Sequence, residues 1–187
     1  MNKMKILLVD DQISSLIVLE QILEDLNAIL LKATSAQEAL RILMKDNIDC
    51  ILLDVCMPDM DGFEFLKTLH NAPTHSNIPV IMVTGKIFSD NETLRGYQYG
   101  AVDFLLKPLD SSVVRRKVGF FIQQAIRIRR IESLEGQLSA LESDIISPVE
   151  TMLNNELTTS SCQTNLTQIL VKLKNLNQLW EEINHAR

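Results

Sequence analysis

The chain is predicted to fold as an α/β domain with a doubly wound, five-stranded parallel sheet, followed by an all-α region. Two observations predict this class. Up to about residue 110, short apolar runs alternate with helical patterns, which is typical of a parallel sheet covered by helices. The apolar runs are nearly continuous, as expected for strands that are buried on both faces. After that point only helical periodicity remains.

The strands are predicted where Ile, Leu and Val are most concentrated, at Lys5–Val9, Ala28–Leu31, Cys50–Leu53, Val80–Val83 and Val102–Leu106. Helical periodicity occurs between them, at Ser14–Leu26, Gln37–Lys45, Phe63–Leu69 and Glu92–Gln98. Two of these helices have capping-box spacing, Ser35 with Glu38 and Ser89 with Glu92. Sheets of this class place their ligands at the carboxyl ends of the strands, so we expect functional residues directly after the strands.

A single long helix is predicted next, over residues 111–146. Its apolar positions follow coiled-coil-like spacings of 4 and 3 residues, at Val114, Val118, Phe121, Ala125 and Ile128 and again at Leu134, Leu138, Leu141 and Ile145. The helix begins inside the α/β domain, which we expect to span residues 1–125. It therefore continues the last helix of that domain without a linker.

A helical hairpin is predicted over residues 147–187. Ser147, Pro148 and Glu150 are the residue types that favour a new helix start. A second apolar pattern with the same spacing follows at Leu166, Ile169, Leu173, Leu176, Trp180 and Ile183. A hairpin this narrow cannot bury its apolar stripes alone, so we expect a homodimer or a bound partner protein.

Charge and composition narrow the function classes. The net charge is −6, and residues 1–110 hold two thirds of the acidic residues but only half of the basic ones, which does not favour nucleic acid as a partner. The basic segment Arg115–Arg130 is interpreted as a solvated helix flank. No apolar run reaches the roughly 18 residues that span a bilayer, so a cytoplasmic protein without membrane contact is expected. Cys50, Cys56 and Cys162 lack the number and spacing of a disulfide framework or a zinc site.

Charged and hydroxyl side chains follow four of the predicted strands. Asp10 and Asp11 come directly after the first, Asp54 after the third, Thr84 after the fourth and Lys107 after the fifth. Three carboxylates at one edge of a sheet repel each other unless a cation lies among them, and hard oxygen ligands suit Mg²⁺. A lysine and a hydroxyl can contact phosphoryl oxygens. The set has the groups that phosphoryl transfer to an aspartate requires.

These motifs closely resemble the response-regulator receiver family of two-component systems, which has a flavodoxin-like fold. The matching residues, within roughly residues 3–125, are Val9-Asp10-Asp11, Leu53-Asp54-Val55-Cys56-Met57-Pro58 with Asp61-Gly62, Val83-Thr84-Gly85 and Lys107-Pro108. The resemblance implies that Asp54 is the phospho-acceptor. It implies that Mg²⁺ is held by Asp10, Asp11, Asp54 and the backbone carbonyl of Cys56.

The resemblance also implies roles around the phosphoryl group. Thr84 and Lys107 are expected to contact it, and Phe104 occupies the aromatic switch position of the family. Cys56 and Lys86 lie two residues after Asp54 and Thr84, at positions that influence dephosphorylation in this family. The peptide bond before Pro108 is expected to be cis.

The expected partners are a cognate histidine kinase or phosphotransfer protein and a downstream protein. The chain is expected to be a switch and not an enzyme, apart from self-phosphorylation from a phosphodonor and autodephosphorylation. Glu142–Val149 is similar, more weakly, to the phospho-acceptor segment of histidine-kinase dimerisation domains, but Ser143 stands where that family has histidine. Two alternatives stay open: a phosphorelay or kinase-related enzyme with a degenerate dimerisation hairpin, and a DNA-binding regulator.

Overall fold

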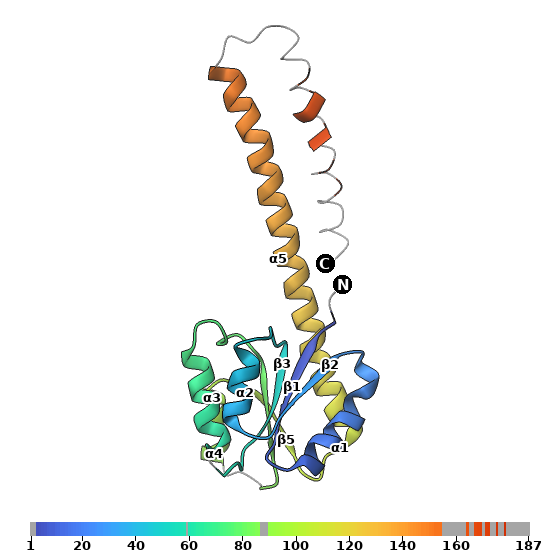
Figure 1. Cartoon of the computed structure of the whole chain (residues 1–187), viewed down its shortest axis with the longest axis vertical. Coiled ribbons are helices and arrows are strands. Elements are labelled where there is room, and N and C mark those ends of the chain that lie inside the picture. Colours follow the sequence, from blue (N-terminus) through green and yellow to red (C-terminus); the bar gives the residue numbers. More distant parts are fainter. Residues whose placement is uncertain are drawn as a thin grey trace. The chain divides into compact units, whose positions relative to one another are not determined.

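Five parallel strands form one sheet in the order β2-β1-β3-β4-β5 (Figure 1). They are β1 (Lys5–Val9), β2 (Ile29–Ala33), β3 (Cys50–Asp54), β4 (Val80–Thr84) and β5 (Ala101–Leu106). The computed structural model describes residues 3–58, 60–86, 90–154, 164, 167–169, 171–172, 175 and 178. The central strands β3 and β4 are buried along their whole length, which is why their sequences are continuous runs of apolar residues. The predicted doubly wound parallel sheet is confirmed.

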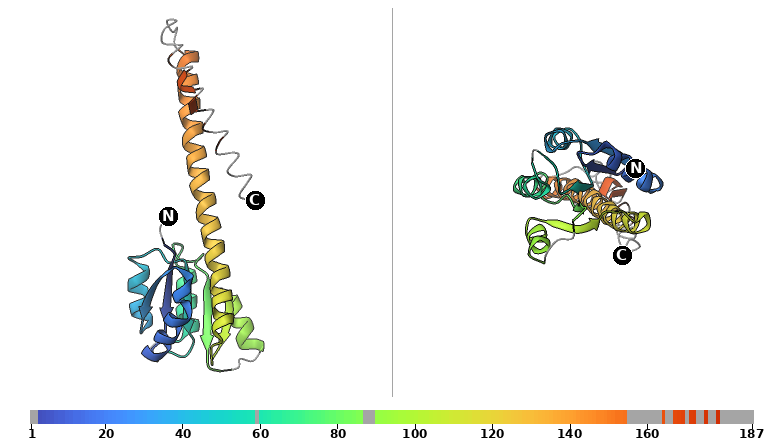
Figure 2. Two further views of the ribbon diagram at one scale, coloured as in Figure 1. Left: turned by 90° about the vertical axis from the view of Figure 1, so that its right-hand side faces the viewer. Right: turned by 90° about the horizontal axis from the view of Figure 1, so that it is seen from below.

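The helices cover both faces of this sheet. They are α1 (Ile13–Leu23), which a 3₁₀ turn η1 (Glu24–Leu26) extends, α2 (Ala36–Leu43), α3 (Gly62–Asn71), α4 (Asp90–Gln98) and α5 (Ser111–Asn154). In Figures 1 and 2, α2, α3 and α4 lie on one side of the sheet, and α1 and the first turns of α5 lie on the other. The Ser35 hydroxyl accepts a hydrogen bond from the Glu38 N–H at 3.2 Å, as its capping-box spacing predicts. Ser89 lies outside the described residues.

The chain divides into two compact units, one that ends at Ala125 and one that begins at Ile126, so that α5 contributes to both. Val114 and Val118 of α5 are fully buried within the first unit. The first two positions of the coiled-coil-like pattern therefore pack inside the α/β unit, because periodicity indicates an apolar face but not what covers it. In the second unit Leu134 and Ile169 are buried. Of the second predicted seam, Leu166, Leu173, Leu176, Trp180 and Ile183 lie outside the described residues, as does Cys162.

The predicted helix start at Ser147 is also wrong. α5 continues through Ser147 and Pro148 to Asn154. A proline inside a helix has no N–H to donate to the carbonyl four residues earlier, which here belongs to Asp144. The Lys172 ammonium donates to that carbonyl at 3.1 Å, and it also pairs with the Asp144 carboxylate at 3.3 Å. A donor that is distant in the sequence thus replaces the bond that proline removes.

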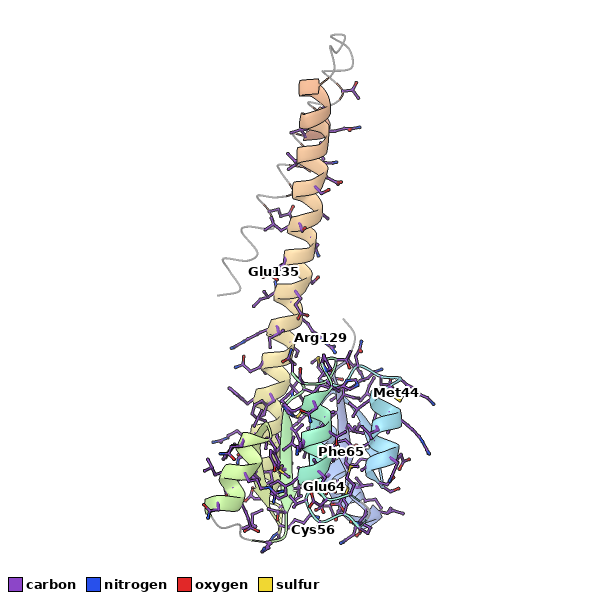
Figure 3. All side chains as sticks on the ribbon, turned by 90° about the vertical axis from the view of Figure 1, so that its left-hand side faces the viewer. Met44, Cys56, Glu64, Phe65, Arg129 and Glu135 are labelled. Atoms are coloured by element: carbon purple, nitrogen blue, oxygen red, sulfur yellow. The ribbon has the colours of Figure 1, made fainter. Side chains whose placement is uncertain are left out.

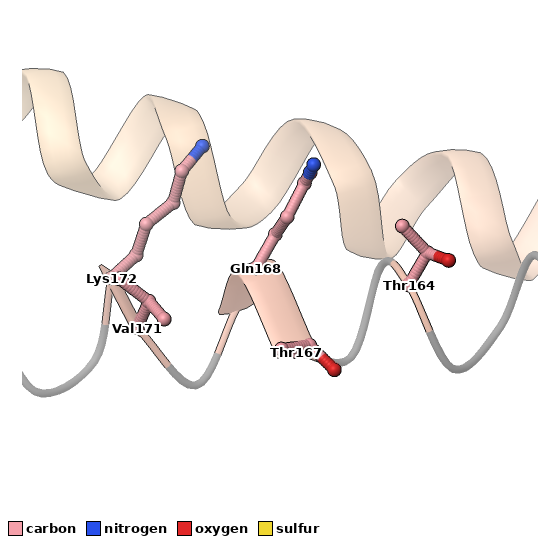
Figure 4. A pocket seen from close by; sticks show the side chains of 5 residues that line it. All are labelled: Thr164, Thr167, Gln168, Val171 and Lys172. Atoms are coloured by element: carbon pink, nitrogen blue, oxygen red, sulfur yellow. The ribbon is translucent and has the colours of Figure 1, made fainter.

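Lys172 belongs to a groove on the second unit. The groove has a volume of about 490 Å³ and is lined by Thr164, Thr167, Gln168, Val171 and Lys172 (Figure 4). Figure 4 shows the side chains of Gln168 and Lys172 extending toward the neighbouring turns of the helix. None of the helices formed by the described residues combines the length and the apolarity that crossing a bilayer requires.

Candidate functional site

Lys107 joins two carboxylates at the carboxyl edge of the sheet. Its ammonium donates to Asp10 Oδ2 at 2.8 Å and to Asp54 Oδ1 at 2.7 Å. Asp10 follows β1, Asp54 ends β3 and Lys107 follows β5, so three separate strands supply this cluster. Cys56, two residues beyond Asp54, marks the same edge in Figure 3, whereas Met44 at the end of α2 lies at the opposite edge.

The strand register brings these side chains together. Val9 of β1 pairs with Leu53 of β3, so Asp10 and Asp54 are the next residues on neighbouring strands. Thr84 of β4 pairs with Leu106 of β5, and the Lys107 N–H donates to the Thr84 carbonyl at 2.7 Å. Because all the strands are parallel, every one of these positions reaches the same edge. The convergence that the sequence predicts for Asp10, Asp54, Thr84 and Lys107 follows from this register.

The two carboxylates are almost completely removed from water. Asp10 is 1% exposed and Asp54 is 4% exposed. Each carboxylate accepts one further hydrogen bond from a backbone amide: Asp10 Oδ1 from Gln12 at 2.9 Å, and Asp54 Oδ2 from Cys56 at 2.8 Å. Buried carboxylates require such partners, because an unpaired buried charge is very costly.

Lys107 remains protonated in this setting. Burial by itself would lower the pKa of the ammonium, but the hydrogen bonds to Asp10 and Asp54 and their negative charges outweigh it. The pKa of Lys107 therefore lies above the ordinary lysine value. At neutral pH the site holds a fixed positive charge between its two buried carboxylates, which can bind the oxygens of a phosphoryl group.

The carboxylate of Asp11 indicates a site for a divalent cation. Its Oδ1 atom is buried and has no hydrogen-bond partner among the described residues. A hard cation such as Mg²⁺ would satisfy this oxygen, and Asp54 could supply a second ligand. No three acidic, histidine or cysteine side chains of the described residues are grouped closely enough to hold a metal alone. Mg²⁺ in proteins keeps several waters and completes its coordination with a few oxygen ligands, a class to which the Asp11 and Asp54 carboxylates belong.

Thr84 and Lys86 are linked through their turn. The Thr84 hydroxyl donates to the Lys86 carbonyl at 3.2 Å and accepts from the Lys86 N–H at 3.1 Å. Thr84 is buried, whereas the Lys86 side chain is 67% exposed and pairs with Glu92 of α4 at 3.1 Å. Thr84 thus lies at the site edge with its hydroxyl engaged, and the Lys86 ammonium is held at α4.

Phe104 faces α4. Its ring packs edge-to-face against Tyr97 with ring centres 5.1 Å apart. A Cβ atom at Gly96 would lie 2.4 Å from the Phe104 ring, so any larger residue there must displace the ring. The predicted cis peptide bond between Lys107 and Pro108 is present.

The sequence alone indicates no structural role for two residues that support the site and its strands. Gly62 appears there only as part of a motif, yet a Cβ at this position would lie 2.5 Å from the Asp54 carbonyl oxygen. In the sequence Lys117 is one of several basic residues on a helix flank. In the structure its ammonium donates hydrogen bonds to the Asp103 carboxylate and to the Phe104 carbonyl, both in β5. The Asp-Gly pair offered a signal for the first. Local sequence offered none for the second.

Known proteins resemble this chain, mainly over its first unit. The family model of the response regulator receiver domain matches residues 6–119. A probable cyclic di-GMP phosphodiesterase of Vibrio cholerae is 33% identical over 146 residues, which cover 78% of this chain and 32% of that protein. The response regulator PleD of Caulobacter vibrioides is 36% identical over 114 residues, which cover 61% of this chain and 25% of that protein. The chain thus spans about a third or less of the length of these relatives.

A solved structure gives the same result for the fold. The chemotaxis response regulator CheY4 of Vibrio cholerae superposes with a TM-score of 0.60 at 30% identity. The superposition covers 64% of this chain and 99% of that one. The likeness therefore concerns the α/β unit and leaves most of α5 and the residues after it unmatched.

Proposed function

Because the chain belongs to the response regulator receiver domain family, we propose that it is a response regulator whose Asp54 accepts a phosphoryl group. The donor is a histidine kinase or a phosphotransfer protein, and the C-terminal helices receive the resulting change. One observation carries the proposal. The Lys107 ammonium lies between the buried carboxylates of Asp10 and Asp54, while the neighbouring Asp11 presents a buried oxygen that has no partner among the described residues.

The reaction requires a nucleophile and charge neutralisation. A carboxylate oxygen of Asp54 attacks the phosphorus of the donor, forming an acyl phosphate, and the bond from phosphorus to the leaving group breaks with its electron pair. Lys107 stays protonated and neutralises charge on the transferred oxygens. The Cys56 N–H fixes the orientation of Asp54 through Oδ2. Thr84 offers a hydroxyl to a phosphoryl oxygen once it leaves the Lys86 carbonyl.

A magnesium ion fits the same residues. Asp11, Asp54 and the Cys56 carbonyl would hold it, with Asp10 acting on it directly or through water. When bound, the ion supplies positive charge to the transferring phosphoryl group. Asp10 keeps its contact with Lys107, which positions the ammonium beside the acceptor.

The output is proposed to be a change in helix association. Ile128 and Ile131 of α5 are each 55% exposed, although both are large and apolar. Complete burial of an exposed isoleucine is worth roughly 1.5–3 kcal/mol, so burying what remains exposed of each side chain against a second copy stabilises a dimer by about half of that. We assign no phosphodiesterase activity to this chain, because the alignment with the relative of that name covers only 32% of that relative.

The proposal is tested by chemical phosphorylation. Full-length protein is incubated with acetyl phosphate and Mg²⁺, and the intact mass is recorded. The expected result is the addition of one phosphoryl group, which Asp54→Asn abolishes and EDTA prevents. Asp49→Asn is the matched control, because Asp49 is a buried carboxylate just before β3, at the opposite end of that strand. Undiminished labelling of the Asp54→Asn protein would falsify the assignment.

A further inference from the structure

We propose that Lys117 is the positioning residue through which a change at the Asp54 site passes from β5 to α5. The inference rests on the proposed function and adds a route to it. Lys117 lies on α5, in the first unit, and Lys107 follows β5. The proposed route therefore runs from β5, the strand that Lys107 follows, to α5, the helix that contributes to both units.

Lys117 contacts the outer edge of β5 at Phe104. β5 is the last strand in the sheet order, so half of its backbone groups face away from β4. The Lys117 ammonium donates to the Phe104 carbonyl at 2.9 Å and to Asp103 Oδ1 at 2.8 Å. The same Asp103 oxygen accepts the Phe104 N–H at 2.7 Å. One ammonium and one carboxylate thus hold both backbone groups of Phe104 against α5.

Phe104 is also fixed on its other sides. Its ring packs on Tyr97 and leaves no room for a side chain at Gly96, so α4 holds the ring. Three residues further along the chain, Lys107 bonds Asp54 Oδ1. A phosphoryl group on Asp54 adds negative charge and three oxygens at this contact, so Lys107 exchanges its bond to Asp54 Oδ1 for one to a phosphoryl oxygen while it keeps its contact with Asp10. Any shift of β5 that follows reaches Phe104, and the backbone of Phe104 is bonded to α5.

The Lys117 contacts are suited to transmission. The side chains of Lys117 and Asp103 are 33% and 27% exposed, so the pair is partly removed from water. Charge-assisted bonds in such surroundings have a better defined geometry than exposed pairs, of which Lys86 with Glu92 is an example. The alternative is that Lys117 only protects an edge strand, as charged residues often do. That alternative affects stability but gives Lys117 no part in the response to phosphorylation.

The test uses full-length protein with and without beryllofluoride and Mg²⁺, a mimic of the acyl phosphate. Hydrogen exchange is measured in peptides from the first four turns of α5, and intact-mass labelling by acetyl phosphate is measured separately. Lys117→Met keeps the aliphatic stem and removes the donor. Lys117→Arg restores a donor, and Arg116→Met is the control, because Arg116 is exposed on the same turn. Asp103→Asn weakens the contact without touching Lys117.

The wild type is expected to take the label and to show an exchange change in α5 on adding beryllofluoride. Lys117→Met should keep the label and lose most of the exchange change, Asp103→Asn should lose part of it, and the Arg variant and the control should keep it. A labelled Lys117→Met protein with the full α5 change overturns the inference, as does a labelled wild type whose α5 does not respond. A wild type that takes no label refutes the proposed function itself.

Discussion

Backbone groups of nearby residues hold Asp54 in place, in addition to the side chain of Lys107. Its carboxylate accepts a hydrogen bond from the Cys56 amide, and its carbonyl oxygen lies only 2.5 Å from the position that a Cβ of residue 62 would take. The Gly62 N–H in turn donates to the Val55 carbonyl at 2.9 Å. At the residue scale the acceptor is therefore positioned by the close approach of residue 62 to the end of β3, which admits only glycine at residue 62.

Gly62→Ala is expected to destabilise the first unit by about 1–3 kcal/mol, because the new methyl group must displace the backbone of Asp54 or Val55. The labelling rate of Asp54 should fall with it. The measurements are chemical unfolding and the rate of mass increase with acetyl phosphate. Gly119→Ala is the control: the nearest atom to its Cβ, on Leu26, is 3.9 Å away, so this variant should be neutral or slightly stabilised. Equal stability of the two variants contradicts the steric account.

Lys107 gives a prediction about pH. Its pKa is raised in the folded protein, so the stability it contributes is present below the ordinary lysine pKa and is lost only as pH rises through the folded value. Labelling with acetyl phosphate should therefore show no loss due to Lys107 between neutral pH and about pH 9. Lys107→Met should label slowly at every pH in that range. A wild-type rate that declines to the level of the variant within this range would show that Lys107 deprotonates there.

At the scale of single elements, α5 shows what a local pattern can and cannot predict. Ser147, Pro148 and Glu150 form a good helix start, but the same residues also fit inside a helix when the freed carbonyl finds a donor. That donor, Lys172, lies 28 residues from Asp144. Nothing in the sequence near Pro148 indicates it.

The bond from Lys172 to the Asp144 carbonyl is tested by a double-mutant cycle. Lys172→Met should destabilise the second unit by about 0.5–1.5 kcal/mol in the wild-type background. In the Pro148→Ala background the residue at 148 regains an N–H, which bonds the Asp144 carbonyl, so Lys172→Met should cost less. Hydrogen exchange in peptides that cover 144–154 gives the readout. Asp144→Asn separates the contribution of the carboxylate, and additive effects of the first two changes contradict the proposed bond.

At the scale of the whole molecule, the sequence predicts the α/β unit far better than the surfaces for association. The strands are recognisable because short, continuous runs of Ile, Leu and Val are typical of strands that are buried on both faces. The register of the parallel strands then places Asp10, Asp54 and Lys107 together. The seam of α5 could not be assigned in the same way, since Val114 and Val118 pack inside the first unit. The role of Lys117 also depends on tertiary contacts that no spacing reveals.

The proposed association leads to a prediction about mass. Full-length protein should be a dimer at tens of micromolar in light scattering, and Ile128→Asp with Ile131→Asp should give a monomer that is still labelled on Asp54. Ser133→Asp with Gln137→Asp adds the same charge at exposed polar positions of α5 and should leave the dimer intact. A monomeric wild type, with or without the phosphoryl group, would overturn the proposed association of α5 with a second copy.

Mapping the acyl phosphate decides whether Asp54 is the phospho-acceptor. Protein labelled with acetyl phosphate is reduced with borohydride, which converts a phosphorylated aspartate to homoserine, and the peptides are sequenced by mass spectrometry. Homoserine is expected at position 54, and unmodified aspartate is expected at positions 10 and 11. Homoserine at either of those two positions, or label that resists borohydride, would contradict this assignment.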